Sequence, residues 1–148
     1  MELQQKANQL EQMKSHIESL EEQKNMVDEY LEEHNDAKET MKKYQEKEEG
    51  TEIMVPIGAD SYVHSKITDN DQVLIGLGAD LSAERKIEKA IEIIERKKDK
   101  IKENKEELEE QIEEMNENAQ ELEQELREEY QELQKQQQQA QGGGQVFQ

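Results

Sequence analysis

Apolar side chains recur at alternating intervals of three and four residues along two long stretches of the chain. In the first stretch, eight of twelve seam positions are apolar: Leu3, Lys6, Leu10, Met13, Ile17, Leu20, Lys24, Val27, Leu31, His34, Lys38 and Met41. In the second stretch, eleven of fourteen are apolar: Ile87, Ile91, Ile94, Lys98, Ile101, Lys105, Leu108, Ile112, Met115, Ala119, Leu122, Leu126, Glu129 and Leu133. This spacing is typical of α-helices that pair in a coiled coil. It predicts helices at residues 1–48 and 84–138.

The intervening residues 49–83 follow a different pattern, rich in β-branched side chains and glycine. Apolar and polar residues alternate in TEIMVPI and SYVHSKI, which predicts two strands, while QVLIGLG is apolar on both faces and predicts a third. Turns are expected at residues 58–60 and 68–71. Two interpretations of residues 81–85 stay open: a short fourth strand that completes a second hairpin, or a helix that begins at Ser82 with Glu84 in its first turn.

The two predicted helices have matching lengths. The first seam covers 41 residue steps from Leu3 to Tyr44, and the second covers 42 from Ile87 to Glu129. The helices can therefore pair along both seams if the chain doubles back at its centre, which brings the start and the end of the chain to one tip. Helix ends fray and admit water. We expect accessible apolar side chains at this tip: Leu3, Leu10, Met13, Leu122, Leu126 and Leu133.

Polar residues interrupt both seams at Lys24, Lys38, Lys98, Lys105 and His34. A polar residue at a seam position weakens the packing or selects one register of the helices. Each buried seam aliphatic contributes on the order of 1.5 to 3 kcal/mol, which is enough in sum to order a helical hairpin.

The strands predicted in residues 49–83 are too short to form a stable sheet by themselves. A small sheet also leaves unpaired edges, which invite strands from another chain. We therefore expect this region to connect the two helices and to serve as an oligomerisation region.

Composition narrows the classes of partner. Only 31% of the residues are hydrophobic and 39% are charged, so the usual compact core is not expected. A formal net charge of -19 repels nucleic acids and anionic membranes, which favours a basic or apolar partner. The chain has no cysteine, no secretory signal and no run of the roughly 20 apolar residues that a membrane span requires. A cytoplasmic protein is expected.

The motifs of enzymes and cofactor sites are absent or incomplete. GLGAD at residues 76–80 superficially suggests a nucleotide-binding turn, but Leu81 occupies the place of the third glycine. DNDQ at residues 69–72 lacks the sixth-position glycine of a calcium loop. His16, His34 and His64 are scattered. We expect no catalysis, cofactor or metal.

The Gln/Gly-rich tail at residues 139–148 is expected to be disordered, with the second helix ending at Gly142 to Gly144. Val146 and Phe147 are candidates for a tethered apolar end.

Taken together, residues 2–138 resemble the α-type subunit of the archaeal prefoldin family, the chaperone also called GimC. The most specific segment is VPIGADSYVHSKITDNDQVLIGLGADLSAERKIEKA. In that family, a VP-hydrophobic-GA phrase, an acidic turn and a glycine-containing strand mark two β-hairpins. They correspond here to residues 55–59, 69–71 and 73–79, and the chain departs from the pattern at Asp60 and Asp80, where related chains often have a small residue.

The resemblance implies a fold class that is mainly α: a long antiparallel two-helix coiled coil, joined by two small β-hairpins that assemble into an oligomeric β-barrel platform. It implies a hexamer of two α and four β subunits. Family members hold unfolded client proteins at the coiled-coil tips without ATP and deliver them to a group II chaperonin. The tip residues named above would contact clients. The platform would be built by Ile53, Val55, Ile57, Val63, Ile67, Val73, Ile75 and Leu77.

Two other functions are compatible with parts of the pattern. A structural coiled-coil tether would use the β region to join two rods and the tips to bind one folded partner. A nucleotide-dependent enzyme would use GLGAD. Suppression of aggregation of several unrelated proteins favours the chaperone, binding of a single folded protein favours the tether, and nucleotide binding favours the enzyme.

Overall fold

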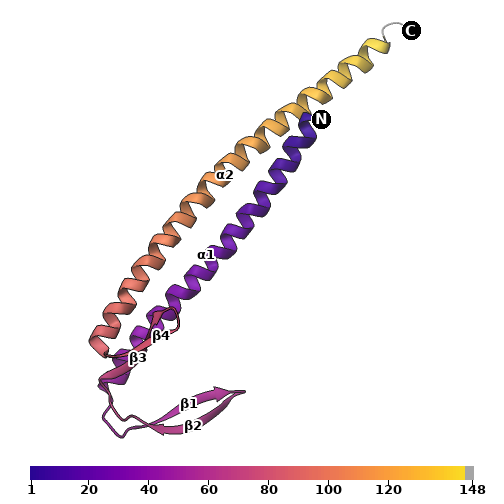
Figure 1. Ribbon diagram of the computed structural model, residues 1–148. Coiled ribbons are helices and arrows are strands. Elements are labelled where there is room, and N and C mark those ends of the chain that lie inside the picture. The colour runs from indigo at the N-terminus through magenta and orange to yellow at the C-terminus, as the bar shows by residue number, and fades with distance from the viewer. Residues whose placement is uncertain (146–148) are drawn as a thin grey trace. The chain divides into compact units, whose positions relative to one another are not determined.

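The computed structural model describes residues 1–145. Its elements, in chain order, are α1 (Glu2–Glu46), β1 (Glu52–Gly58), β2 (Ser61–Lys66), β3 (Gln72–Gly78), β4 (Leu81–Lys86) and α2 (Ile87–Gln145) (Figure 1). The chain divides into two compact units. The terminal unit contains residues 1–26 and the chain from Asn104 onward, and the central unit is Val27–Glu103. The prediction of two long helices and two small β-hairpins is confirmed.

Within each unit, α1 and α2 pair in antiparallel fashion. In the terminal unit, Lys6 forms ion pairs with Glu125 and Glu129, whereas Lys24 pairs with Glu109 at 3.6 Å. The partner number falls as the α1 number rises, which defines an antiparallel pair. In the central unit, Lys38 likewise pairs with Glu95, at 2.6 Å.

The seam residues are the ones that become buried in the terminal unit. Ile17 and Leu20 of α1 and Ala119 and Leu126 of α2 are less than 9% exposed. All four belong to the seams traced in the sequence. The 3-4 spacing therefore identified the buried faces of both helices correctly.

The four strands form two separate two-stranded antiparallel sheets, β1–β2 and β3–β4. In the first hairpin Val55 lies opposite Val63, and in the second Ile75 lies opposite Ala83. Each register shifts just before its turn, between Pro56 and Gly58 and between Gly76 and Gly78. The first bulge directly follows Pro56, the one proline of the chain, which has no N–H to donate to a ladder.

The same turn, Gly-Ala-Asp, closes both hairpins. Gly58, Ala59 and Asp60 have φ values of 107°, 49° and 57°, and the matching residues 78–80 have 95°, 49° and 59°. Two consecutive residues with positive φ suit a tight hairpin whose twist matches that of its strands. Glycine and aspartate tolerate this region, but alanine is strained there.

A small core fixes the second hairpin to the helices of the central unit. Ile75, Ala90 and Ile94 are buried together. The partly buried residues around them come from α1, β3 and α2: Ala37, Met41, Val73 and Ile93. The 0% exposed Ile87 begins α2, and its backbone N–H donates to the carbonyl of Asp71 at 2.9 Å.

The loop between the hairpins holds the end of α1. The side-chain amide of Asn70 donates to the carbonyls of Gln45 (3.2 Å) and Lys47 (2.7 Å), and the Tyr44 hydroxyl donates to the carbonyl of Asp69 at 3.1 Å. The last carbonyls of a helix have no partner within it. The side chain of Asn70, from a distant part of the chain, provides the hydrogen-bond donor for carbonyls at the end of α1.

The second helix begins and ends later than the sequence predicts. Residues 81–86 form β4, so α2 begins at Ile87 instead of Ser82 or residue 84. Ser82 and Glu84 are paired with residues of β3, so their backbone groups belong to the sheet. The local preference of Ser82 for a helix N-cap is weaker than this strand pairing. At the other end, α2 continues to Gln145, so residues 139–145 are helical and not disordered. Helix propagation is easier than nucleation, and glutamine and alanine favour it. Val146 and Phe147 lie outside the described residues.

Candidate functional site

Large apolar side chains are exposed on both β-hairpins of the central unit. Eight of them lie between residues 54 and 81: Met54, Val55, Ile57, Tyr62, Val63, Leu74, Leu77 and Leu81. Ile57 is 63% exposed and Leu74 70%. A concentration of exposed large apolar side chains of this kind marks an interaction site in a protein that remains in water. We call these eight residues the hairpin surface.

The predicted platform residues divide between this surface and the interior. Val55, Ile57, Val63 and Leu77 belong to the hairpin surface. Ile53 and Val73 are half-buried. Ile67 and Ile75 are only 2% and 6% exposed, so the chain itself covers them. Period-two alternation identifies the apolar face of a strand, but it does not say which chain packs against that face.

Four residues of the hairpin surface were missed in the sequence: Met54, Tyr62, Leu74 and Leu81. Met54 and Leu74 are adjacent in sequence to Val55 and Ile75 and therefore point to the opposite face of their strands. The available signal was that QVLIGLG is apolar on both faces. Such a strand needs a partner on each face.

The backbone of the first hairpin also lacks neighbours. β1 and β2 pair only with each other, so within the described residues each has one edge without a strand partner. An isolated two-stranded hairpin is marginally stable in water, and a free edge is a template for another strand. Five residues of the hairpin surface lie on these same two strands: Met54, Val55, Ile57, Tyr62 and Val63.

In the terminal unit, the six predicted tip residues differ in exposure. Leu3, Leu10, Met13 and Leu122 are half-buried, and Leu133 is 40% exposed. Leu126 is 7% exposed and is therefore part of the seam between α1 and α2. Its position near the chain end suggested accessibility, but the pairing of the helices extends past it.

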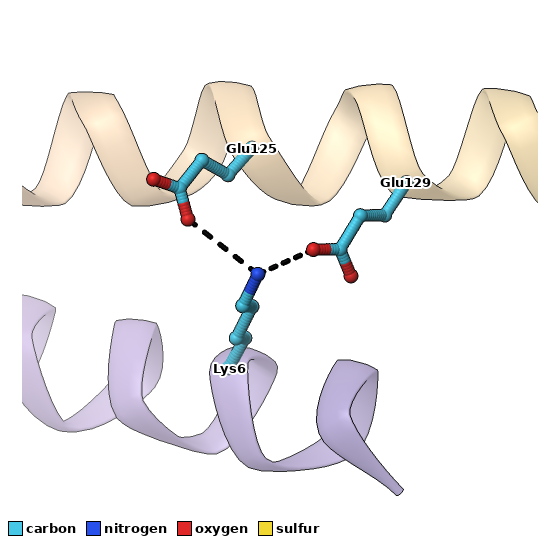
Figure 2. A network of polar contacts seen from close by, with 3 residues as sticks. All are labelled: Lys6, Glu125 and Glu129. Carbon is cyan, nitrogen blue, oxygen red and sulfur yellow. Dashed lines mark hydrogen bonds and ion pairs between the residues drawn. The ribbon is translucent and has the colours of Figure 1, made fainter.

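Lys6 joins the two helices next to these residues. Figure 2 shows its ammonium between two carboxylates of α2, with Glu125 at 3.5 Å and Glu129 hydrogen-bonded to it. The hydrogen bond with Glu129 and the attraction of both carboxylates raise the pKa of Lys6 above its ordinary value. The tip of the helix pair is thus held by charge as well as by apolar contact.

A second charged cluster joins the helices in the central unit. Glu95 of α2 accepts from Lys38 of α1 at 2.6 Å and lies 3.4 Å from the ammonium of Lys98. The hydrogen bond from Lys38 lowers the pKa of the Glu95 carboxyl below its ordinary value. Three lysines at seam positions, Lys6, Lys24 and Lys38, therefore have glutamate partners on the facing helix.

The possible nucleotide-binding and metal-binding motifs of the sequence do not form such sites in the structure. GLGAD ends β3 and turns into β4, whereas a dinucleotide site needs a turn from a strand into a helix. Among the described residues, no group of three or more His, Asp or Glu side chains is placed to hold a metal ion. No helix in the described part of the chain is both long and apolar enough to cross a bilayer.

Comparisons with known proteins agree with this architecture. A family profile described as prefoldin subunit matches residues 13–139. Two proteins named prefoldin subunit alpha match: one from Haloquadratum walsbyi, 42% identical over 55 residues, and one from Methanopyrus kandleri, 41% identical over 51 residues. These matches cover 37% and 34% of this chain, and only 36% and 32% of the relatives' lengths.

A solved structure of filamentous PFD from Methanocaldococcus jannaschii has a similar fold, with a TM-score of 0.72 and 26% identity. The similarity covers 80% of this chain and 98% of the other. The matched profile spans most of the residues from which the helix pair and both hairpins are built. The chain therefore belongs to the prefoldin family, whose members are chaperones and not enzymes.

Proposed function

We propose that this chain is an α-type subunit of a cytoplasmic chaperone assembly, which holds unfolded proteins without ATP and passes them to a group II chaperonin. One observation carries the proposal: the eight large apolar side chains of the hairpin surface are exposed in the described part of the chain. The relatives named prefoldin subunit alpha support the subunit type. The filamentous PFD structure supports the idea that such chains associate.

In this proposal, the oligomerisation region 49–83 joins subunits into a β-barrel platform of two α and four β subunits. Strands of partner subunits extend the free edges of β1 and β2 and bury exposed side chains such as Val55, Ile57 and Val63. Burial of apolar side chains is the main driving force of such association. Leu77 is covered in the same way on the second hairpin.

Clients bind to the apolar side chains of the terminal unit: Leu3, Leu10, Met13, Leu122 and Leu133. Leu126 joins them only when the helix pair opens beyond Lys6, because it is buried in the closed pair. Each contact is weak, and several subunits bind one client at several points, which raises the overall affinity while every contact stays reversible. The acidic surface keeps the loaded complex in solution.

The assembly is tested by charge substitution on the hairpin surface. A Val55→Asp/Ile57→Asp variant, co-expressed with β-type subunits, is expected to sediment as an unassembled chain. Met26→Asp is the matched control, because Met26 is 57% exposed but lies on α1, outside the hairpins. If the double variant assembles as the wild type does, the hairpin surface is not the interface.

Client capture is tested separately, in the assembled complex. Leu3→Gln/Leu133→Gln should lower the suppression of aggregation of two unrelated unfolded proteins, while Met26→Gln should not. The mass of the complex is the control for assembly. Unchanged protection by the double variant would refute the tip assignment, and binding of one folded protein with no protection of unfolded ones would favour the tether.

A further inference from the structure

The central unit contains a cationic groove beside the first turns of α2. The groove has a volume of about 510 Å³. Five cationic side chains line it: Arg85, Lys89, Arg96, Lys97 and Lys100. Leu77 and Ile93 supply its apolar lining, and no carboxylate side chain is among the lining residues.

This concentration of positive charge is unusual for the chain. Residues 85–102 carry eight of the 19 lysines and arginines and only four acidic residues, although the whole chain has a net charge of -19. The following part of α2, residues 103–132, has fourteen glutamates and two cationic residues. The groove is thus a local cationic site on an acidic protein.

The fold determines which side chains line the groove. On α2, residues 89, 93, 96 and 100 recur at intervals of three and four and so share one helix face. By the same spacing, this face lies on the other side of α2 from the seam residues Ile87 and Ile94. Ile93 both lines the groove and packs against the small core of the central unit. From the second hairpin, Leu77 and Arg85 lie on the face that also carries Ile75, the residue packed against Ala90 and Ile94. Helix and hairpin are therefore held together by the core directly beside the groove.

The five cations are engaged to different degrees. Lys97 donates to the carbonyl of Gly76 at 2.7 Å and ties α2 to β3. Lys89 lies 3.5 Å from Glu92, and Arg85 donates to the carbonyl of Glu84 at 2.9 Å. Across the described residues, no carboxylate lies within ion-pair distance of Arg96 or Lys100.

The groove favours an anion for two physical reasons. Five like charges around one space repel one another, and an anion between them removes that repulsion. Lys89 also lies in the first turns of α2, where the positive end of the helix dipole disfavours a cation. Both unfavourable contributions are relieved by a bound carboxylate.

We propose that this groove binds an acidic peptide segment of a partner protein, in which carboxylates flank one large apolar side chain. The carboxylates pair with Arg96 and Lys100, and the apolar side chain contacts Ile93, which lies on α2 outside the hairpin surface. A simple polyanion would use the cations but not the apolar lining. The acidic helix of a second copy fits less well, because its aliphatic residues, such as Leu108 and Ile112, already belong to the seam.

The net charge of the chain does not prevent this binding. At physiological ionic strength the Debye length is about 8 Å, so distant glutamates are largely screened from an approaching acidic peptide. Contacts at hydrogen-bond distance within the groove are screened much less. Binding is therefore local to the groove.

The test uses fluorescence anisotropy of a labelled peptide, Asp-Glu-Glu-Phe-Glu-Asp-Glu, titrated with the full chain. Arg96→Glu/Lys100→Glu should weaken binding at least about tenfold, as expected when charge pairs become repulsive. Lys42→Glu/Lys102→Glu is the matched control: it makes the same charge change at two exposed positions, and Lys102 lies on the opposite face of α2 from Lys100. The control should bind within about twofold of the wild type.

A second peptide, with serine in place of the phenylalanine, tests the apolar lining. It should bind about fivefold to tenfold more weakly, corresponding to the burial of part of an aromatic side chain. Equal binding of both peptides, or inorganic polyphosphate displacing the labelled peptide at equal charge concentration, would reduce the groove to a general anion site and overturn the proposal. Absence of peptide binding would also overturn it.

Two measurements separate the remaining explanations. Circular dichroism checks that each variant is folded; should the glutamate variant unfold, Lys100→Gln against Lys102→Gln gives the same comparison with a milder change. Sedimentation at several concentrations tests the second copy as the occupant. If the wild-type chain self-associates and the Arg96→Glu/Lys100→Glu variant does not, the groove binds a second copy of this chain, and the proposed partner is wrong.

Discussion

The terminal and central units differ in how completely they bury their apolar side chains. In the terminal unit, two helices cover each other's apolar seams, with Ile17, Leu20, Ala119 and Leu126 buried and Lys6 and Lys24 paired across. In the central unit, Ile75, Ala90 and Ile94 form a core, yet eight large apolar side chains remain exposed on the hairpins.

The difference shows where the chain requires partners. A helix pair satisfies its backbone internally and needs only one apolar stripe for each helix. A two-stranded hairpin leaves edges unpaired and has two faces to cover. The apolar residues of the terminal unit are therefore mostly satisfied within the chain, whereas many of those in the hairpins are not.

The largest expected effect is a difference in the free energy of unfolding between substitutions at two adjacent residues of β3. Ile75→Ala should lower the free energy of unfolding of the isolated chain by about 2 to 5 kcal/mol, because Ile75 is buried in the core of the central unit. Leu74→Ala should change it by no more than about 0.5 kcal/mol, because Leu74 is exposed. Urea denaturation followed by circular dichroism measures both. Equal effects would mean that β3 is not docked on the helices through Ile75.

A smaller effect is expected at the loop that holds the end of α1. Asn70→Ala removes the side-chain donor to the carbonyls of Gln45 and Lys47 and should lower the free energy of unfolding by about 1 kcal/mol. Asn35→Ala, at an exposed position within α1, should be neutral or slightly stabilising. The same denaturation experiment compares the two, and an Asn70 variant as stable as the Asn35 variant would rule out this cap.

The hairpin turns offer a gain in stability. Ala59→Gly and Ala79→Gly should each raise the free energy of unfolding by about 0.5 kcal/mol, since glycine relieves the strain of positive φ while it loses more entropy on folding. Ala83→Gly, in β4, is the control and should lower it by about 0.5 to 1 kcal/mol. Thermal unfolding gives the sign of each change. Loss of stability in both turn variants would argue against the Gly-Ala-Asp geometry.

The smallest effects are the pH dependences of the ion pairs, because exposed pairs contribute little. The folded-state pKa of Glu95 is lowered, so its contribution is present above the unfolded value of about 4.3 and is lost as pH falls through the lower folded value. The pKa of Lys6 is raised, so its contribution is present below about 10.4 and is lost as pH rises through the higher folded value.

Two variants check these signs by denaturation as a function of pH. The Lys38→Met variant should be less stable than the wild type at neutral pH, and the difference in stability should shrink in acid, where Glu95 becomes protonated. For Lys6→Met, the difference in stability should shrink only in strong base, where Lys6 of the wild type loses its charge. Reversal of the two pH ranges would contradict the assignment of Glu95 to the central cluster and Lys6 to the terminal one.

Much of the helical part was predictable from the sequence, because the apolar spacing of a coiled coil is a local signal. The spacing alone assigns residues such as Leu20 and Ile94 to the buried faces of their helices, and both are buried. The hairpins were predictable for the same reason, since alternation and the two Gly-Ala-Asp turns are local as well. The resemblance of residues 55–90 to one family added the topology.

The features that could not be predicted from the sequence depend on contacts between residues that are distant along the chain. Residues 81–86 carry a helix-start signal, and only pairing with β3 makes them a strand. The alternation in β3 marks Ile75 as apolar, but its burial depends on Ala90 and Ile94. The cationic groove could not be predicted, because its residues are distributed among β3, β4 and α2. In the sequence its lysines and arginines resemble ordinary solvated charges.

Hydrogen–deuterium exchange of the chain, alone and in complex with β-type subunits, tests most directly the claim that the hairpins need partner chains. The account predicts that backbone amides of residues 52–66 become strongly protected in the complex, while those of residues 2–26 keep the exchange rates of the free chain. Unchanged exchange in residues 52–66, together with new protection in residues 2–26, would contradict it.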